Sequence, residues 1–182
     1  MKLVILDRDG VINEDSDEYV KSHHEWRAIP GSLEAIARLN QNGYRVVVAT
    51  NQSGIGRGLF DTNALNAMHA KMLRALATVG GKIDAVFFCP HTPEDNCDCR
   101  KPKPGLFQQI AHRFGVALAD TTMIGDSHRD LEAGRAAGCE IMLVRTGKGA
   151  DVEKEGRAPP GTLVFDDLAG AVAHLVRRAE AA

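Results

Sequence analysis

The sequence lacks any excess of basic charge. Its 182 residues contain 22 Lys and Arg against 24 Asp and Glu, which gives a net charge of −2 at pH 7. This balance provides no bulk basic surface for nucleic acid, so we expect no nucleic-acid partner. A small-molecule ligand is the expectation that follows.

Long hydrophobic runs are missing as well. The apolar run at residues 3–6 ends at Asp7 and is too short for a signal peptide or a membrane span. We therefore expect a cytoplasmic protein with no membrane partner, and a monomer by default. The length suits one α/β domain with a sizeable core, so residues 1–182 are predicted to form a single domain.

Cysteine is scarce, with four in the chain. In the cytosol these would stay reduced, so metal binding or simple burial is expected rather than disulfide bonds. Cys139 stands apart at the start of an apolar run and is predicted to be a buried, small hydrophobic residue.

Short β-branched runs alternate with longer segments of helical period. The predicted strands are residues 3–6, 45–49, 85–88, 122–124, 141–144 and 163–165. The predicted helices are residues 32–42, 62–79, 105–114, 130–137 and 168–180. This alternation predicts an α/β fold with a mostly parallel sheet covered by helices on both faces. Residues 13–27 are predicted to be an irregular flap, and residues 148–162 a surface loop.

Polar residues follow four of the predicted strands. They are Asp7-Arg8-Asp9-Gly10, Thr50-Asn51-Gln52-Ser53-Gly54, Cys89-Pro90-His91 and Gly125-Asp126-Ser127. Ligands of open α/β sheets bind beyond the carboxyl ends of the strands, so these groups are expected at one rim.

Asp7 and Asp9 leave the first strand at positions i and i+2, which places two like charges on the same side of an extended chain. A cation would relieve their repulsion. With Asp126 they would form an oxygen-rich site suited to Mg²⁺. The alternative is that the carboxylates only cap helices or lie in loops.

The segment from Thr50 to Gly58 combines a hydroxyl, side-chain amides and a Gly-x-Gly-x-Gly spacing, which can wrap a phosphate. Its alternative is a tight strand-to-helix connection. Arg100 and Lys101 offer cations for the same phosphate, unless they belong to a solvated basic loop.

Four potential zinc ligands lie within eleven positions: Cys89, His91, Cys97 and Cys99. Four protein ligands fill a tetrahedral site, so the predicted zinc is structural and leaves no open position for catalysis. The zinc would fix Arg100 and Lys101 against the rim. Free thiols are the alternative.

Four motifs together resemble the ordered motifs of the haloacid dehalogenase (HAD) superfamily over nearly the whole chain. They are Asp7-Arg8-Asp9-Gly10, Thr50-Asn51, Lys101-Pro102-Lys103-Pro104 and Gly125-Asp126-Ser127. The Cys/His loop and the Gly-rich segment resemble the branch that contains heptose bisphosphate and histidinol phosphatases. The resemblance implies a Rossmann-like three-layer α/β sandwich with a minimal cap and a zinc-binding loop.

The resemblance also implies roles for individual residues. Asp7 would be the nucleophile and Asp9 the general acid and base, while Thr50 and Lys101 would stabilise the phosphoryl group. Mg²⁺ would be held by Asp7, the backbone carbonyl of Asp9, and Asp126. The implied substrate-binding residues are Asp15, Ser16, Asp17, Glu18, Tyr19, Asn51, Gln52, Ser53, Arg100 and Ser127.

A phosphorylated sugar is the substrate that the resemblance implies first, with removal of the 7-phosphate of a heptose 1,7-bisphosphate in lipopolysaccharide core synthesis. Histidinol phosphate is the alternative. A receiver-like signalling module is a remote alternative. Such a module would hold its phosphoryl group, whereas Asp9 is placed to help remove it. His69, His112 and His174 lie in predicted helices away from these motifs, and we expect them to be ordinary surface or core histidines.

Overall fold

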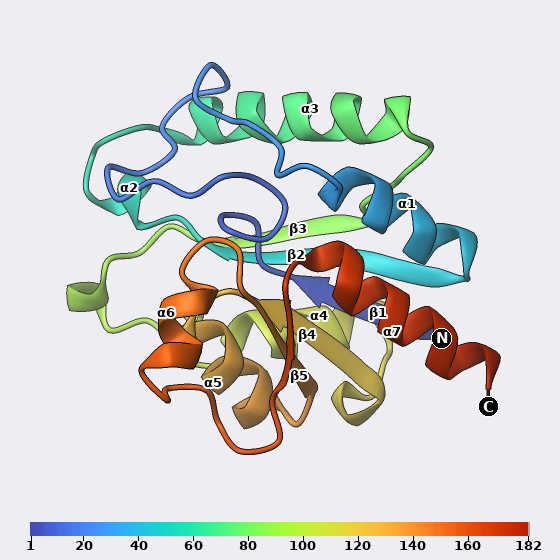
Figure 1. The fold of residues 1–182 in the computed structure, drawn as a ribbon. Coiled ribbons are helices and arrows are strands. Elements are labelled where there is room, and N and C mark those ends of the chain that lie inside the picture. The colour runs from blue at the N-terminus through green and yellow to red at the C-terminus, as the bar shows by residue number, and fades with distance from the viewer. Residues whose placement is uncertain (182) are drawn as a thin grey trace.

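The computed structural model describes residues 1–181 and contains one six-stranded sheet with the strand order β3-β2-β1-β4-β5-β6 (Figure 1). All strand pairs in this part of the chain are parallel. The strands are β1 (Lys2–Leu6), β2 (Tyr44–Asn51), β3 (Ala85–Cys89), β4 (Thr121–Gly125), β5 (Glu140–Val144) and β6 (Leu163–Phe165). The predicted α/β class and sheet are confirmed.

The five longest helices lie where they are predicted, within two residues at each end. They are α1 (Ser32–Gln41), α3 (Thr62–Thr78), α4 (Gly105–Phe114), α5 (His128–Ala137) and α7 (Leu168–Glu180). Two single 3₁₀ turns, Pro93–Asp95 and Leu118–Asp120, connect other elements. Among the described residues no helix is both long and apolar enough to cross a membrane.

Two short helices, α2 (Ser53–Gly56) and α6 (Gly149–Lys154), were not predicted. The prediction that residues 148–162 form only a surface loop is therefore wrong at its start. Val152 explains the difference, because this single apolar residue is buried in the cluster that also contains Leu143 of β5. One large apolar side chain in a polar segment gives no periodic pattern to detect.

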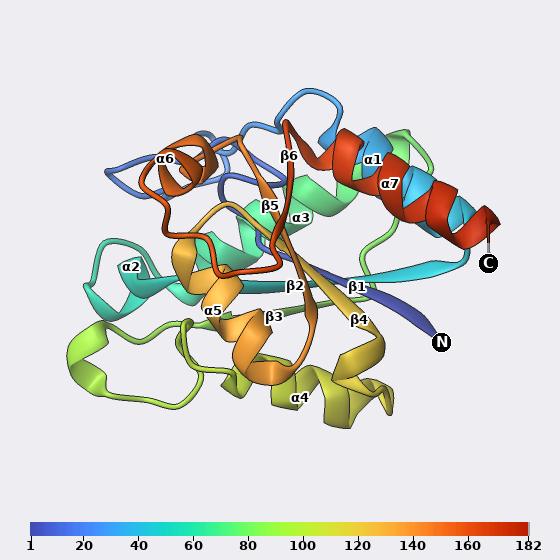
Figure 2. The same ribbon diagram turned by 60° about the horizontal axis from the view of Figure 1, so that its bottom comes forward.

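The helices cover both faces of the sheet, and alternate strand residues face each layer. Val4 and Leu6 of β1 pack in the core with α1, α3 and α7, whereas Leu3 and Ile5 pack in the core with α4, α5 and α6. Figures 1 and 2 show α1, α3 and α7 on one side of the strands and α4 and α5 on the other.

The strand order reverses beside β1, which lies between β2 and β4. Ile5 is in register with Val47 on one side and with Met123 on the other. The crevice at such a switch point is where open α/β sheets bind ligands. The residues that follow β1 therefore enter the predicted rim.

Residues 13–27 form the predicted irregular flap, held by an isolated bridge between Asn13 and Ala28. The flap packs on α3, where Lys71 Nζ donates to the backbone oxygens of His23 and Trp26 at 2.7 and 2.8 Å. Trp26 is buried beneath it.

Candidate active site

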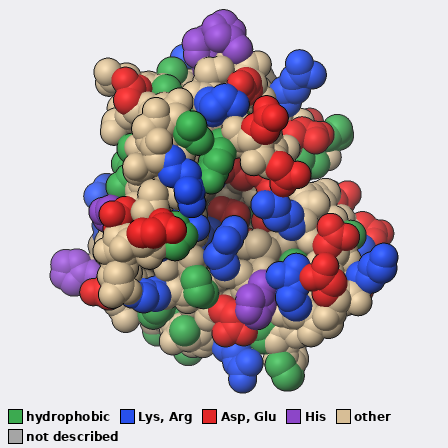
Figure 3. Space-filling view, turned by 90° about the vertical axis from the view of Figure 1, so that its left-hand side faces the viewer, with side chains coloured by type: hydrophobic (Ala, Val, Ile, Leu, Met, Phe, Trp, Pro, Cys, Tyr) green, Lys and Arg blue, Asp and Glu red, His purple; other side chains and the backbone are tan. Residues whose placement is uncertain are grey.

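Three buried carboxylates meet at the carboxyl end of the sheet. Asp7 follows β1, Asp126 follows β4, and Asp130 comes from the first turn of α5. One oxygen from each lies within 4.8 Å of the others. Figure 3 shows this end of the molecule as a hollow with acidic side chains inside and Lys and Arg side chains around it.

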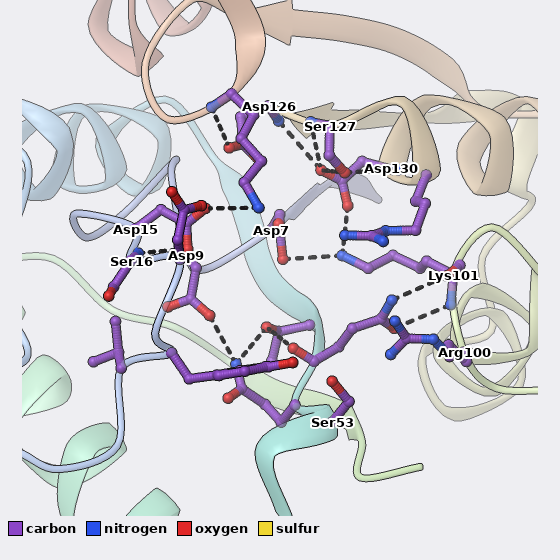
Figure 4. Close-up of a pocket in the computed structure, with 18 of the residues that line it drawn as sticks. Asp7, Asp9, Asp15, Ser16, Ser53, Arg100, Lys101, Asp126, Ser127 and Asp130 are labelled. Atoms are coloured by element: carbon purple, nitrogen blue, oxygen red, sulfur yellow. Dashed lines mark hydrogen bonds and ion pairs between the residues drawn. The ribbon is translucent and has the colours of Figure 1, made fainter. Parts of the chain in front are cut away.

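Lys101 provides the one ammonium group in this cluster among the described residues. Its Nζ donates to Asp7 Oδ1 at 2.9 Å and to Asp130 Oδ1 at 2.6 Å (Figure 4). It also donates to the Ala49 backbone oxygen at 2.7 Å. Although burial opposes its charge, Asp130 and Asp7 raise the pKa of Lys101. The lysine is therefore a fixed positive charge.

One ammonium group does not neutralise three carboxylates. Burial and the Asp130 charge raise the pKa of Asp7 to about 7, and burial with the charges of Asp130 and Asp7 raises the pKa of Asp126 well above its usual range. A divalent cation would favour their ionised forms. Hard carboxylate oxygens are also the ligands that Mg²⁺ prefers, so the donor set of Asp7 and Asp126 fits this ion.

Two glycines leave room for Asp126. Gly10 and Gly147 both have positive φ angles, of 83° and 57°. A Cβ atom on either glycine would overlap the Asp126 carboxylate. The backbone N–H of Lys148 also donates to Asp126 Oδ2 at 2.9 Å. The glycines thus permit a close approach that fixes this carboxylate.

Asp9 lies beside the cluster and has its own set of donors. Its Oδ1 accepts from Arg8 and from Asn13 Nδ2, and its Oδ2 accepts from Gln52 Nε2 at 3.0 Å. Burial alone would raise the pKa of Asp9, but the Arg8 charge and these hydrogen bonds lower it. These contacts favour the ionised carboxylate, which can accept a proton.

The residues that follow Ala49 line the same pocket, but several of their polar groups bind protein atoms. Asn51 exchanges two hydrogen bonds of 3.0 Å with the Lys101 backbone. Gln52 Nε2 also donates to Thr50 Oγ1 at 2.9 Å. Asn51 and Gln52, expected to bind substrate, thus also position Lys101 and Asp9.

Ser127 caps helix α5 in a reciprocal arrangement with Asp130. Its Oγ donates to Asp130 Oδ2 at 2.8 Å. Asp130 was not singled out from the sequence. The Ser-x-x-Asp spacing that opens the helix is a detectable capping signal, but it does not reveal that the other oxygen reaches Lys101.

The site residues surround a pocket of about 360 Å³. Of the predicted flap contacts, Asp15, Ser16, Asp17 and Tyr19 line it. Glu18, which is exposed on the flap, does not line it. Substrate binding by Glu18 stays a prediction.

Lys148 and two arginines of the pocket were not predicted. Lys148 Nζ lies 3.6 Å from Asp15 Oδ2 and so connects the flap to the loop after β5. Arg57 and Arg129 line the pocket together with the predicted Arg100. Burial and the charges of Arg129 and Arg57 lower the pKa of Arg100, as expected for guanidinium groups that lie near one another. Arg57 lies within the segment from Thr50 to Gly58, and Arg129 lies two positions after Ser127. Their proximity to these motifs in the sequence could have indicated them as pocket residues.

The four predicted zinc ligands converge at the end of β3. The distances are 3.4 Å from Cys89 Sγ to His91 Nδ1, 3.3 Å from His91 Nδ1 to Cys99 Sγ, and 3.6 Å from Cys97 Sγ to each of the other two sulfurs. Tetrahedral zinc with bonds of about 2.0–2.3 Å gives ligand separations of roughly 3.3–3.8 Å. The cluster could therefore hold zinc.

His69 corrects another prediction. It was expected to lie away from the motifs, but its Nε2 is 3.2 Å from Arg8 Nη1, next to Asp9. The two residues are 61 positions apart in the chain, so no local pattern indicates their contact.

Comparisons with known proteins agree with this geometry. The HAD-hydrolase-like family matches residues 98–171. D-glycero-beta-D-manno-heptose-1,7-bisphosphate 7-phosphatases from Bordetella bronchiseptica and Pseudomonas aeruginosa are 57% and 54% identical to the chain. The alignments cover 98% and 96% of this chain and 100% and 98% of theirs.

Solved structures show the same similarity. The crystal structure of D,D-heptose 1,7-bisphosphate phosphatase from B. bronchiseptica, complexed with magnesium and phosphate, has a TM-score of 0.96 at 57% identity. It covers 98% of this chain and 99% of its own. The phosphatase from Burkholderia thailandensis has a TM-score of 0.78 at 55% identity, covering 97% and 99%. These findings confirm the predicted superfamily, its fold and the phosphatase class. The chain belongs to the D-glycero-beta-D-manno-heptose-1,7-bisphosphate 7-phosphatase family of HAD-like hydrolases.

Proposed function

We propose that the protein hydrolyses the 7-phosphate of D-glycero-β-D-manno-heptose 1,7-bisphosphate and releases heptose 1-phosphate and inorganic phosphate. The names of relatives 50–57% identical to the chain support this substrate and its β anomer. The observation that carries the proposal is that one pocket combines the buried Asp7 with three arginines.

In the first proposed step, an Asp7 oxygen attacks the phosphorus of the 7-phosphate and the bond to the sugar oxygen breaks. Asp9 donates a proton to that departing oxygen, for which it must first take up a proton. In the second step Asp9 removes a proton from water, which attacks the aspartyl-phosphate and frees Asp7. Asp7 and Asp9 line the same pocket, which supports these roles.

The phosphoryl group gains negative charge at its oxygens as it transfers, and fixed donors stabilise it. Lys101 and the Thr50 hydroxyl are the proposed donors. Both residues line the pocket together with Asp7, and Lys101 Nζ contacts the Asp7 carboxylate. Mg²⁺, which Asp7, Asp126 and the Asp9 backbone carbonyl would hold, supplies further neutralisation of this charge.

The second phosphate needs its own recognition, and Arg57, Arg100 and Arg129 are suited to it. Guanidinium groups bind phosphate oxygens in a bidentate manner. Histidinol phosphate has no second phosphate, and it carries a positively charged amine that three arginines would repel. The arginine cluster therefore favours the bisphosphate over the alternative substrate.

The test is phosphate release by the purified protein with Mg²⁺ on the α and β anomers of heptose 1,7-bisphosphate, on heptose 7-phosphate and on histidinol phosphate. We expect kcat/KM for the β-bisphosphate to exceed that for histidinol phosphate by about a hundredfold or more, which is about 2.7 kcal/mol of transition-state binding. Equal or higher activity on histidinol phosphate would refute the proposed substrate.

A role in lipopolysaccharide core synthesis, a cytoplasmic location, a monomeric state and a single domain remain predictions.

A further inference from the structure

A fully buried arginine stands between the two catalytic carboxylates in sequence. Arg8 has 0% exposure. Its Nε and Nη2 donate to Asp9 Oδ1 at 3.1 and 2.8 Å, so two of its three nitrogens hold one carboxylate oxygen. Neither Arg8 nor any residue of α3 lines the pocket. The guanidinium therefore acts on the site only through Asp9.

The third nitrogen of Arg8 faces helix α3. Nη1 lies 3.2 Å from His69 Nε2 and 4.0 Å from Met68 Sδ. A thioether is a weak acceptor, so the imidazole is the stronger partner. Burial and the Arg8 charge lower the pKa of His69 to about 4. The neutral ring then carries its proton on Nδ1 and accepts the Nη1 hydrogen at Nε2.

We infer that His69 is a positioning residue for the acid–base step: by accepting from Nη1 it fixes the plane of the Arg8 guanidinium, and this plane sets the place of the Asp9 carboxylate. The inference rests on the proposed role of Asp9 in phosphate ester hydrolysis. It assigns a function to α3, which supplies no group to the pocket itself.

The physical reason is that a guanidinium donates in a fixed fork. If Nη1 has no acceptor, the group can turn about its side-chain bonds towards another partner, and Nε and Nη2 turn with it. Asn13 and Gln52 would then hold Asp9 alone. A misplacement of about 1 Å can lower turnover by about a hundredfold without loss of substrate binding.

The test compares two variants that differ in the acceptor. His69→Leu removes it, whereas the side-chain amide oxygen of His69→Gln can take the place of Nε2. We expect His69→Leu to lower kcat about 10- to 100-fold, with KM within about twofold of the wild-type value. The kcat of His69→Gln should stay within about threefold of wild type. Met72→Leu, a volume-conserving change one turn further along α3, is the control for core packing.

Several outcomes would overturn the inference: a folded His69→Leu protein with wild-type kcat, equal losses in the Leu and Gln variants, or a change in KM alone. If His69→Leu did not fold, His69→Asn, whose amide is too short to reach Nη1, would replace it with the same expectation. A wild-type protein inactive on every phosphate ester tested would instead refute the proposed function, so the two failures are distinguishable.

Discussion

Lys101 Nζ and Asp7 Oδ1 lie 2.9 Å apart although 94 positions separate the two residues in the chain. The same ammonium group also reaches Asp130, and all three side chains are buried. The contact joins the end of β1 to the loop that follows the Cys/His cluster. It places a fixed cation beside the proposed nucleophile.

Replacing this cation tests its two consequences together. We expect Lys101→Met to lower kcat by about 10²–10³-fold, because a donor to the transferring phosphoryl group is lost. The free energy of unfolding should fall by about 3 kcal/mol, since a buried ion pair loses one partner. Lys154→Met, at the exposed end of α6, should leave both quantities unchanged. Wild-type kcat in a folded Lys101→Met protein would contradict the role of Lys101.

The arginine cluster predicts a substrate-dependent defect. Arg57→Ala or Arg129→Ala should each raise KM for heptose 1,7-bisphosphate about tenfold, the effect of losing a charged hydrogen bond worth about 1.5 kcal/mol. KM for heptose 7-phosphate, which has no second phosphate, should stay within about twofold. Arg113→Ala, on the exposed end of α4, is the control. Equal losses on the two substrates would contradict recognition of the second phosphate.

The Cys/His cluster predicts one zinc ion per chain, measurable by elemental analysis. Cys97→Ser should lose the zinc and lower Tm by at least about 5 °C, because about 2 kcal/mol of lost binding free energy produces that shift in a chain of this size. Cys139→Ala, which changes the cysteine outside the cluster, should retain the zinc. Purified wild-type protein with no zinc and no affinity for it would refute this site.

The half-buried imidazole of His69 predicts how stability depends on pH. Its pKa is about 4 in the folded protein against 6.5 ordinarily, so between these values the unfolded chain binds a proton that the folded chain does not. Stability is therefore lost as pH falls below 6.5, by up to about 1.4 kcal/mol per pH unit from this group.

Urea unfolding at about pH 7.5 and about pH 5 checks this dependence. From the higher to the lower pH, wild type should lose about 1–2 kcal/mol more than His69→Gln. His112→Gln, an exposed position on α4, should follow wild type. An equal loss in wild type and His69→Gln would contradict the lowered pKa of His69.

The sequence predicts most of this fold because local patterns determine it. The strand at residues 3–6 is a short apolar run that ends at Asp7, and the order of strands and helices already implies that Asp7, Thr50 and Asp126 share a rim. Lys101 and the four cluster ligands follow from motif spacing. Val152 shows the limit, since one large apolar side chain in a polar segment gives no period from which α6 could be detected.

The unpredicted parts of the site depend on contacts between distant segments. Arg8 and His69 meet only when α3 packs over β1. In the sequence Asp130 has the position of a helix-capping residue, and its contact with Lys101 forms only when another loop packs against the helix. Glu18 does not line the pocket that Asp17 and Tyr19 line, and no apolar period indicates which residues of a turn face a pocket.

The central claim is that Asp7 becomes transiently phosphorylated. The most direct measurement is a rapid acid quench of the enzyme during turnover of heptose 1,7-bisphosphate with a radiolabelled phosphate, in the presence of Mg²⁺. The labelled peptide is then identified, and kcat is measured for the Asp7→Asn variant. We predict label on the peptide that contains Asp7 and a fall in kcat of about 10⁴-fold or more for Asp7→Asn, with Asp120→Asn, at the opposite end of β4, unchanged. An Asp7→Asn protein with near-normal turnover, or label on another residue, would contradict the account.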